Sequence, residues 1–589
     1  MTHKKILLLA VLAAAYMTAS ADNGYYRVNE RFGFRTPAPA DTAQTSLRNS
    51  MPEKRYSIAN SWTGSYAGPV QSMLYFYRTM KSPMAFADAY DAYTLKAGDL
   101  LFASPETFAL SLSGRGSFPT DFRTRPDSRY SLSLAGTPNS GVSLGATATG
   151  TLGSGTGGNE YRAIGNAAFW TAVDYERYSA KLAFATNYMR FAPDRADRDN
   201  RRTLYHNNIA FISQNFALGG TDSRPAVELI HTFKWEDISR SYNTLLSDSL
   251  GTAAANDSVA FQTFKNTLTV RTLRDNVPVM PFSLLYYFEH EYRYHANYID
   301  HSLTRDEMHD HHLHTGFSIF DTRPMANGSF SYDLTGDVFI YGILTSECNL
   351  VATFVRSLTA GTEPLTITWG AGGHRDSNTK FITRYDASFV RWTNNFSKFH
   401  RLDAQARIAL PKRNISLGIN FDNVWDMVYI DDNGLPAQAS GSTQIVAVDL
   451  KADFRFSDIY WENQFVYQYT SNRDIMPLPD FTLYSNLYYY RQFRHAGFQA
   501  GIDIRYYTAF YANIFDPYTG LFHTQHTQKI GNYPELGLYA NVRVLDGLKI
   551  YAEWNCWNSG LFGGDCSPMP GIARTHSRLD IGISWDLNI

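Results

Sequence analysis

The chain has 589 residues, of which 15% are aromatic and 18% charged, and its formal net charge is -2. This aromatic-rich, charge-poor balance suits a large β protein and provides no basic field for nucleic acid, so no nucleic-acid partner is expected. A mean hydropathy of -0.30 still permits a membrane barrel, because a barrel needs apolar residues only at alternate strand positions.

Residues 1–21 have the pattern of an export signal. Lys4 and Lys5 precede an apolar run from Ile6 to Tyr16, and Ala19-Ser20-Ala21 forms a small-x-small cleavage site. Residues 22–104 contain few periodic apolar runs. We expect them to form an extended N-terminal segment that lies in the periplasm or in the lumen of a barrel.

Alternating apolar and polar residues begin at Phe108 and continue to the end of the chain. The last strand shows the pattern most clearly, because Leu579, Ile581, Ile583, Trp585, Leu587 and Ile589 alternate with polar residues and glycine. Side chains of a strand point to opposite faces in turn, so one face is apolar and the other polar. Residues 105–589 are therefore predicted to form a transmembrane antiparallel β-barrel of roughly 16–20 strands.

Short and long connections alternate along the last third of the chain. Tight turns join the predicted strand pairs 402–410 with 415–423, 446–456 with 459–469, 481–490 with 498–506 and 536–544 with 548–554. Longer polar loops separate these pairs. Bacterial barrels have short periplasmic turns and long extracellular loops, whereas a soluble β-sandwich has no reason to keep that asymmetry.

Short motifs spread along the chain resemble the putative porin family of Gram-negative outer-membrane β-barrel proteins. They are Tyr90-Asp91-Ala92-Tyr93, His231-Thr232-Phe233-Lys234, Lys265-Asn266-Thr267, Glu289-His290-Glu291, Tyr506-Tyr507-Thr508, Asp516-Pro517-Tyr518-Thr519-Gly520, Ile530-Gly531-Asn532-Tyr533-Pro534 and Ser584-Trp585. The resemblance implies a barrel in the outer membrane, in contact with its lipid. The final strand also resembles the terminal strand that the barrel-assembly machinery reads, although the usual last residue is aromatic and here is Ile589.

Charged residues occupy many of the positions between the apolar ones and are candidates to face the lumen. They are Asp403, Arg407, Asp449, Lys451, Asp453, Arg455, Glu462, Asp503, Arg505, Arg543, Lys549, Glu553, Asp580 and Asp586. Both signs occur in similar number, which suits a hydrated channel but equally suits structural ion pairs in a barrel without an open pore.

Histidine and cysteine provide two further candidate sites. Seven of the 16 histidines fall between His290 and His314, and His309, His311, His312 and His314 are the candidate metal ligands. The spacing matches no specific zinc motif, so a polar loop that is rich in histidine is the alternative. Cys556 and Cys566 lie in one predicted loop and could form a disulfide in an oxidising compartment, or remain unpaired thiols.

The favoured function is diffusion of small hydrophilic solutes through an outer-membrane porin. The alternative is a non-conducting barrel that acts as a scaffold or as the membrane partner of a surface complex, with an oligomeric or surface-lipoprotein partner and a metal-handling role. No nucleophile elbow, zinc-protease motif or phosphate-binding loop is found, so we expect neither an enzyme nor a cofactor.

Overall fold

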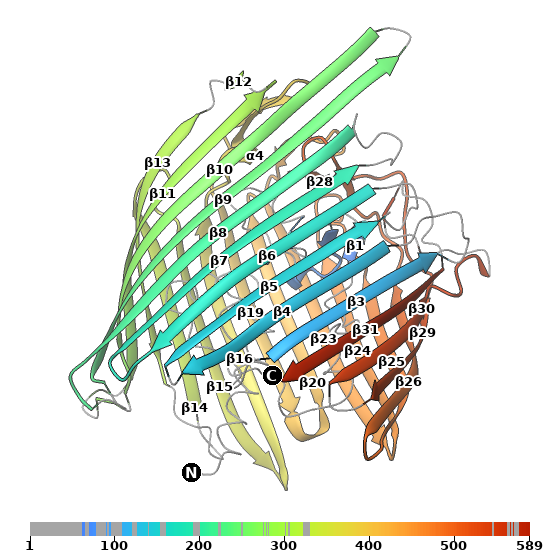
Figure 1. The fold of residues 1–589 in the computed structure, drawn as a ribbon. Coiled ribbons are helices and arrows are strands. Elements are labelled where there is room, and N and C mark those ends of the chain that lie inside the picture. Colours follow the sequence, from blue (N-terminus) through green and yellow to red (C-terminus); the bar gives the residue numbers. More distant parts are fainter. Residues whose placement is uncertain are drawn as a thin grey trace.

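A closed antiparallel barrel makes up most of the protein (Figure 1). The computed structural model describes residues 62–64, 70–77, 90, 94–95, 109–119, 127–139, 141–153, 161–192, 201–221, 225–248, 251–274, 276–277, 280, 282–300, 302–303, 307–321, 330–544, 547–561, 566, 569–570 and 577–588. The predicted export signal at residues 1–21 lies outside the described residues, as does most of the segment 22–104.

Within the described residues, 22 strands form the barrel. They are β3 (Ala109–Pro119), β4 (Asp127–Asn139), β5 (Val142–Gly153), β6 (Tyr161–Asp174), β7 (Tyr178–Ala192), β8 (Arg201–Leu218), β9 (Val227–Asp248), β10 (Gly251–Thr272), β11 (Ser283–Ile299), β13 (Met308–Phe320), β14 (Phe330–Tyr341), β15 (Cys348–Ala360), β16 (Glu363–Asp376), β19 (Phe399–Leu410), β20 (Ile415–Trp425), β23 (Ser442–Phe456), β24 (Ile459–Thr470), β25 (Phe481–Gln492), β26 (Ala496–Tyr507), β29 (Glu535–Val544), β30 (Leu548–Asn555) and β31 (Arg578–Asn588). Strand β12 (Ser302–Leu303) adds a short pairing to β11.

The last strand closes the barrel by pairing with the first. Ala109 of β3 lies opposite Asn588 of β31, and this register continues to Pro119 opposite Arg578. On β31 the apolar positions are exposed, with Ile583 at 49%, whereas the intervening Asp580 is 2% exposed. The predicted transmembrane barrel is therefore confirmed, with apolar side chains outside and polar side chains inside.

The number of strands exceeds the expected 16 to 20. Strand β5 consists mainly of Ala, Gly, Ser and Thr, so its two faces differ less in the sequence than those of β4, where Tyr130, Leu132 and Leu134 alternate with serine. Two connections are very short, since only residues 249–250 separate β9 from β10 and only residues 361–362 separate β15 from β16. Short connections leave more of the chain for strands.

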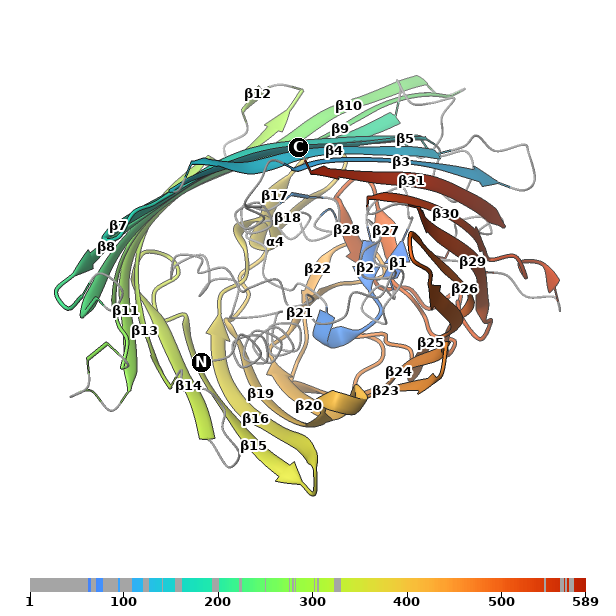
Figure 2. The same cartoon turned by 60° about the horizontal axis from the view of Figure 1, so that its bottom comes forward.

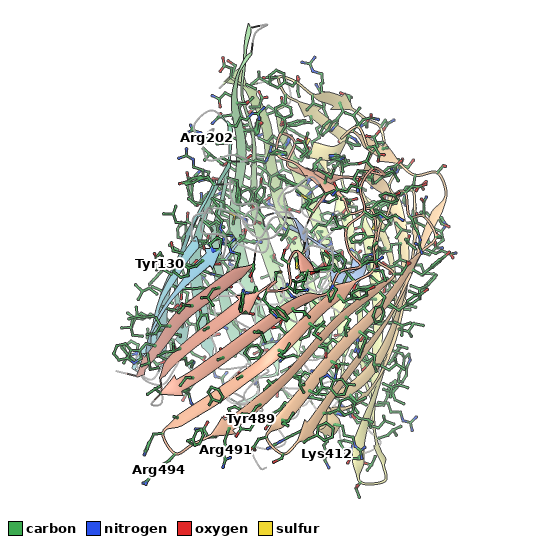
Figure 3. All side chains as sticks on the ribbon, turned by 90° about the vertical axis from the view of Figure 1, so that its right-hand side faces the viewer. Tyr130, Arg202, Lys412, Tyr489, Arg491 and Arg494 are labelled. Atoms are coloured by element: carbon green, nitrogen blue, oxygen red, sulfur yellow. The ribbon has the colours of Figure 1, made fainter. Side chains whose placement is uncertain are left out.

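In the last third of the chain, the two ends of the barrel differ as the turn pattern predicted. Strands β19 and β20 are joined by the one-turn helix η4 (Pro411–Arg413), and residues 457–458 join β23 to β24. Figure 3 shows Lys412, Arg491 and Arg494 around this periplasmic end, with Tyr489 above them on the outer wall. Cationic side chains beside outward tyrosines suit the boundary between phospholipid headgroups and hydrocarbon.

The long connections at the other end carry short elements that fold into the barrel. They are α4 (Lys380–Thr383), β17 (Arg384–Asp386), β18 (Arg391–Thr393), β21 (Val428–Ile430), β22 (Pro436–Gln438), β27 (Ile514–Asp516) and β28 (Leu521–His523). Figure 2 shows them inside the ring of strands, together with β1 (Trp62–Gly64) and β2 (Val70–Ser72). A further short helix, η2 (Tyr75–Tyr77), follows β2. Among the described residues, no helix is long and apolar enough to cross a membrane.

Gly582 of β31 provides a first test of the packing inside the wall. A Cβ atom at this position would lie 2.1 Å from Cζ of Tyr551, whose ring covers the glycine, whereas a Cβ at Gly150 of β5 would meet nothing within 4 Å. We expect Gly582→Ala to destabilise the barrel by about 1–3 kcal/mol, as overpacking usually does. Gly150→Ala is the control and should be neutral or slightly stabilising. Urea unfolding in detergent measures both, and equal effects would contradict this packing.

Candidate functional site

Apolar side chains from the inward-folded loops pack inside the extracellular half of the barrel. The inward-folded loops are residues 377–398, 426–441 and 508–534. Phe381, Tyr385 and Trp392 belong to one buried cluster with Tyr205 of β8 and Phe261 of β10. Since Tyr205 and Phe261 alternate with outward positions, their rings point into the barrel. The loops are thus packed on the inner wall as a hydrophobic core.

Asp257 of β10 anchors two of these loops to the wall. Its carboxylate accepts hydrogen bonds from the backbone N–H of Ser388 at 3.0 Å and from the Ser388 hydroxyl at 2.7 Å. It also accepts a hydrogen bond from the Tyr518 hydroxyl at 2.7 Å. The side chain is buried, so these three bonds replace the water that the carboxylate loses. One wall carboxylate therefore holds loop residues from two different connections.

Arg240 of β9 is a second, cationic anchor. It is 2% exposed, and its guanidinium donates a hydrogen bond to the carbonyl oxygen of Pro517. Its positive charge also acts on the buried phenols of Tyr90 and Tyr385. Burial raises the pKa of Tyr385 well above its ordinary value, so this phenol stays neutral and does not compensate the arginine charge. The anchor joins the wall, a loop and the N-terminal segment.

Two amide side chains of the wall bind the described N-terminal residues. Gln468 of β24 accepts a hydrogen bond from the backbone N–H of Tyr75 at 3.0 Å and donates one to the carbonyl of Met73 at 3.2 Å. Asn187 of β7 accepts a hydrogen bond from the backbone N–H of Leu95 at 2.8 Å and donates one to the Leu95 carbonyl at 3.1 Å. Each amide pairs with the backbone as a neighbouring strand would. These N-terminal residues therefore lie against the inner wall.

A hydrogen-bonded belt crosses neighbouring strands of the inner wall. His314 Nε2 lies 2.8 Å from Asp337 Oδ2, to which Asn349 donates at 3.1 Å. The other amide atom, Asn349 Oδ1, lies 2.8 Å from His374 Nδ1, and His374 Nε2 lies 2.5 Å from Asp403 Oδ1. Both ring nitrogens of His374 lie within hydrogen-bond distance of oxygen atoms on neighbouring strands. The belt connects β13, β14, β15, β16 and β19.

Ion pairs between strands or along them involve many of the predicted lumen charges. Arg407 lies 2.8 Å from Asp449, and Lys549 lies 2.8 Å from Asp586. The remaining contacts of the predicted charges are Asp403 with His374, Lys451 with Asp453 at 3.7 Å, Arg455 over the Tyr460 ring at 5.0 Å, Glu462 with the Tyr488 hydroxyl at 2.8 Å, Arg505 with Glu535 at 3.1 Å, Arg543 with Gln492 at 2.7 Å and Asp580 with Arg115. Asp503 and Glu553 are buried in the wall. That these charges steer a solute stays a prediction.

The alternative prediction placed the histidine cluster in a polar loop. The described histidines of the cluster lie instead on strands β11 and β13. His309 and His311 are exposed on the outer face, whereas His312 and His314 are fully buried on the inner face. On the outer face, His311 Nδ1 lies 3.1 Å from Nε2 of His290. Successive side chains of a strand alternate, so the four predicted ligands cannot all bind one metal ion.

Cys556 and Cys566 lie beside Glu535 at the extracellular end of the wall. Each residue is buried, and one ligand atom from each lies within 4.8 Å of the other two. Both cysteines are free thiols, and the disulfide remains the prediction for the oxidised chain.

A cluster of opposite charges joins three extracellular loops. His526 Nδ1 lies 2.7 Å from Asp432 Oδ2, and His526 Nε2 lies 3.3 Å from Asp474 Oδ1. The hydrogen bond to Asp432 is the main reason why the pKa of His526 is raised. A raised histidine pKa stabilises the folded loops below the ordinary value of about 6.5, and this contribution is lost as the pH rises through the raised pKa.

We therefore expect trypsin to cut the loops after Arg473 and Lys529 faster at a pH above the raised pKa than at mildly acidic pH. The His526→Gln variant is the control, because it retains a side chain of similar size but cannot titrate. The ratio of the wild-type to the variant cleavage rate, measured at each pH, removes the pH dependence of the protease. A ratio that does not change with pH would contradict the expectation.

Sequence reasoning missed several inner-wall residues that hold the loops or belong to the belt. Asp257, Arg240 and Asn349 were not among the predicted site residues, although Lys234 and Glu236 alternate with Phe233 and Trp235 on β9 in the same way as the later lumen candidates, and Arg240 lies on the same face. That alternation was a usable signal for the inward face. The partners in distant loops left no local signal, because contacts such as Asp257 with Tyr518 depend on the tertiary fold.

Comparison with known proteins gives a family and a fold. A family model described as "Putative porin" matches residues 194–588. No curated protein matches the chain. Among solved structures, a mutant form of the ferric enterobactin receptor PfeA from Pseudomonas aeruginosa matches with a TM-score of 0.61 at 10% identity, covering 82% of this chain and 81% of that one. The siderophore receptor PirA from Acinetobacter baumannii matches with a TM-score of 0.59 at 10% identity, with coverages of 82% and 81%.

The unliganded ferric citrate transporter FecA is similar in fold, with a TM-score of 0.59 at 10% identity over 82% of this chain and 79% of that chain. Such low identity shows the fold alone. The family match and these outer-membrane neighbours place the chain in the outer membrane.

Proposed function

The chain belongs to the putative porin family, and from this premise we propose that it lets small hydrophilic solutes diffuse across the outer membrane once its inward-folded loops move. The observation that carries the proposal is the contrast between wall and loops. The wall is a continuous sheet of paired strands whose inner face carries charges of both signs, whereas the loops lie against it through the buried cluster around Phe381 and Trp392 and through polar contacts of Asp257 and Arg240. We expect the barrel to persist when the loops undock, because its strands pair with one another and not through the loops.

Lumen charges of both signs support passage of polar solutes without strong preference for anions or cations. Arg407 with Asp449 and Lys549 with Asp586 place opposite charges side by side on the wall. A wall of this kind offers hydrogen bonds to neutral and zwitterionic solutes and no field of a single sign. No chemical step is needed for this function.

Swelling of liposomes that contain refolded protein tests the proposal. We expect isosmotic sugars and amino acids to enter at rates that fall with solute size, and entry to increase when the loops are loosened. Heat-modifiable migration in gels establishes that the barrel is folded. Folded protein that admits none of the solutes, with either closed or loosened loops, would refute diffusion.

The second candidate is a non-conducting barrel that serves as the membrane partner of a surface complex, either as an oligomer or with a lipoprotein. The buried cluster around Phe381 and Trp392, which packs loop residues inside the extracellular half of the barrel, is the observation that favours it. In both cases we propose that β31 is the strand that the barrel-assembly machinery recognises. Co-purification from the native membrane of a stoichiometric partner, together with absence of solute entry, would favour this candidate.

A further inference from the structure

Three buried side chains from different parts of the sequence meet beside the last extracellular loop. Glu535 is the first residue of β29, Cys556 directly follows β30, and Cys566 lies in the connection to β31. Their exposed fractions are 7%, 4% and 2%. Strands β29 and β30 are paired, and this pairing brings Glu535 and Cys556 to the same end of the wall.

The neighbouring loop is fixed by hydrogen bonds, so Cys556 is held beside the start of β29. The amide of Asn558 donates to the carbonyl of Pro534 at 2.6 Å and accepts from the N–H of Leu536 at 3.1 Å. Tyr533 donates to the carbonyl of Asn558 and lies 3.1 Å from the carbonyl of Leu561. These bonds connect both sides of Glu535 to the residues that follow Cys556.

The three ligand atoms lie within 4.8 Å of one another. Around a tetrahedral zinc ion, with Zn–S bonds of about 2.3 Å and Zn–O bonds of about 2.0–2.2 Å, ligand atoms are separated by roughly 3.3–3.8 Å. Ligand atoms that are 4.8 Å apart would therefore approach by about 1.0–1.5 Å to close on an ion, and closer pairs by less. Two sulfur atoms favour zinc or cadmium and disfavour calcium and magnesium, which prefer oxygen ligands.

The charges in and around the cluster also suit a divalent cation. Two thiolates and the Glu535 carboxylate carry three negative charges, and Arg505, at 3.1 Å from Glu535, supplies one positive charge. With the two positive charges of a divalent ion, the net charge of these groups is zero. Charge balance matters here because unpaired charge is costly in a buried site.

We propose that the reduced chain binds one thiophilic divalent cation, zinc or cadmium, through Cys556 Sγ, Cys566 Sγ and a carboxylate oxygen of Glu535. The ion ties the last extracellular loop to the first residue of β29 at the outer mouth of the barrel. The fourth ligand position is available to water. This metal centre is separate from the histidine cluster of β11 and β13, and it does not depend on the proposed function.

The test uses the full barrel, refolded in detergent, reduced and then freed of metal with a chelator. Cys348 is exposed and is replaced by Ser, so that only the two site thiols remain. We expect zinc to bind with a stoichiometry of one and to slow maleimide labelling of both thiols at least tenfold. Cys556→Ser and Cys566→Ser should each weaken binding about 100-fold, and Glu535→Gln about 10-fold.

The matched control is Glu363→Gln, because Glu363 also pairs with an arginine, Arg413 at 3.5 Å, but lies at the periplasmic end. This variant should bind zinc as the parent does. The effect of zinc on maleimide labelling is measured in the parent protein, which has no substitution in the site. A variant that misfolds therefore does not prevent the test. Two results would overturn the proposal: equal zinc binding by the serine variants, or maleimide labelling of the reduced parent protein that zinc does not slow.

Discussion

Replacing Asp257 with alanine is expected to open the barrel. The substitution removes three hydrogen bonds that join β10 to residues Ser388 and Tyr518. Hydrogen bonds to a charged group contribute about 1.5–3 kcal/mol each and are not additive, so a loss of roughly 3 kcal/mol in loop docking is reasonable. The undocked population should then rise about 100-fold. In a planar bilayer, Asp257→Ala should show frequent, larger conductance steps than the wild type.

Asp449→Ala is the matched control for this experiment. Asp449 is also a wall carboxylate with hydrogen bonds, but they come from Arg407 and Asn420 of neighbouring strands and from no inward-folded loop. This variant should keep the closed-state conductance of the wild type. If both variants opened equally, weakening of the wall rather than release of the loops would explain the effect, and the proposed role of Asp257 would be wrong.

The second large effect is expected at the centre of the belt. His374→Ala removes the group that connects Asn349 to Asp403 and leaves the buried Asn349 amide without one partner. Loss of one partner of a buried, charged hydrogen-bond network costs about 3–5 kcal/mol. We therefore expect a clear fall in the urea midpoint of the barrel, measured by heat-modifiable migration and tryptophan fluorescence.

His231→Ala serves as the comparison for His374→Ala. His231 alternates with the inward residues Thr232 and Ile230 of β9, so its side chain is on the outer face. Removing it should change the free energy of unfolding by less than about 0.5 kcal/mol. A midpoint for His374→Ala that equals that of His231→Ala would show that the belt does not stabilise the wall.

The strands of the last third were predictable from sequence to within a few residues. The predicted pair 481–490 and 498–506 corresponds to β25 and β26, which end only one or two residues further on and join through the same tight turn. The period of two is a local property of the chain, and a lipid-facing wall imposes it strongly. Only alternate aromatic residues of a run lie outside, however: Tyr489 is exposed, whereas Tyr488 points inward and stacks on Tyr460.

The packing of the loops inside the barrel could not be predicted from a local pattern in the sequence. Loop residues such as Phe381 and Trp392 follow no strand period, and their partners on the wall are more than a hundred positions away in the chain. The histidine cluster was misread for a related reason. Its polar outer side, with His309 and His311, looks like a loop in sequence, but the β11 and β13 strands continue through it with polar side chains outside.

A reversible lock between the wall and a loop tests the central claim most directly. In a background without the native cysteines, Asp257→Cys and Ser388→Cys place two thiols at positions whose wild-type side chains are 2.7 Å apart. A short, reducible thiol cross-linker then fixes the loop against β10. The account predicts that cross-linking stops solute entry into liposomes and that reduction restores it. Solute entry at the same rate in the locked and the reduced protein would contradict it.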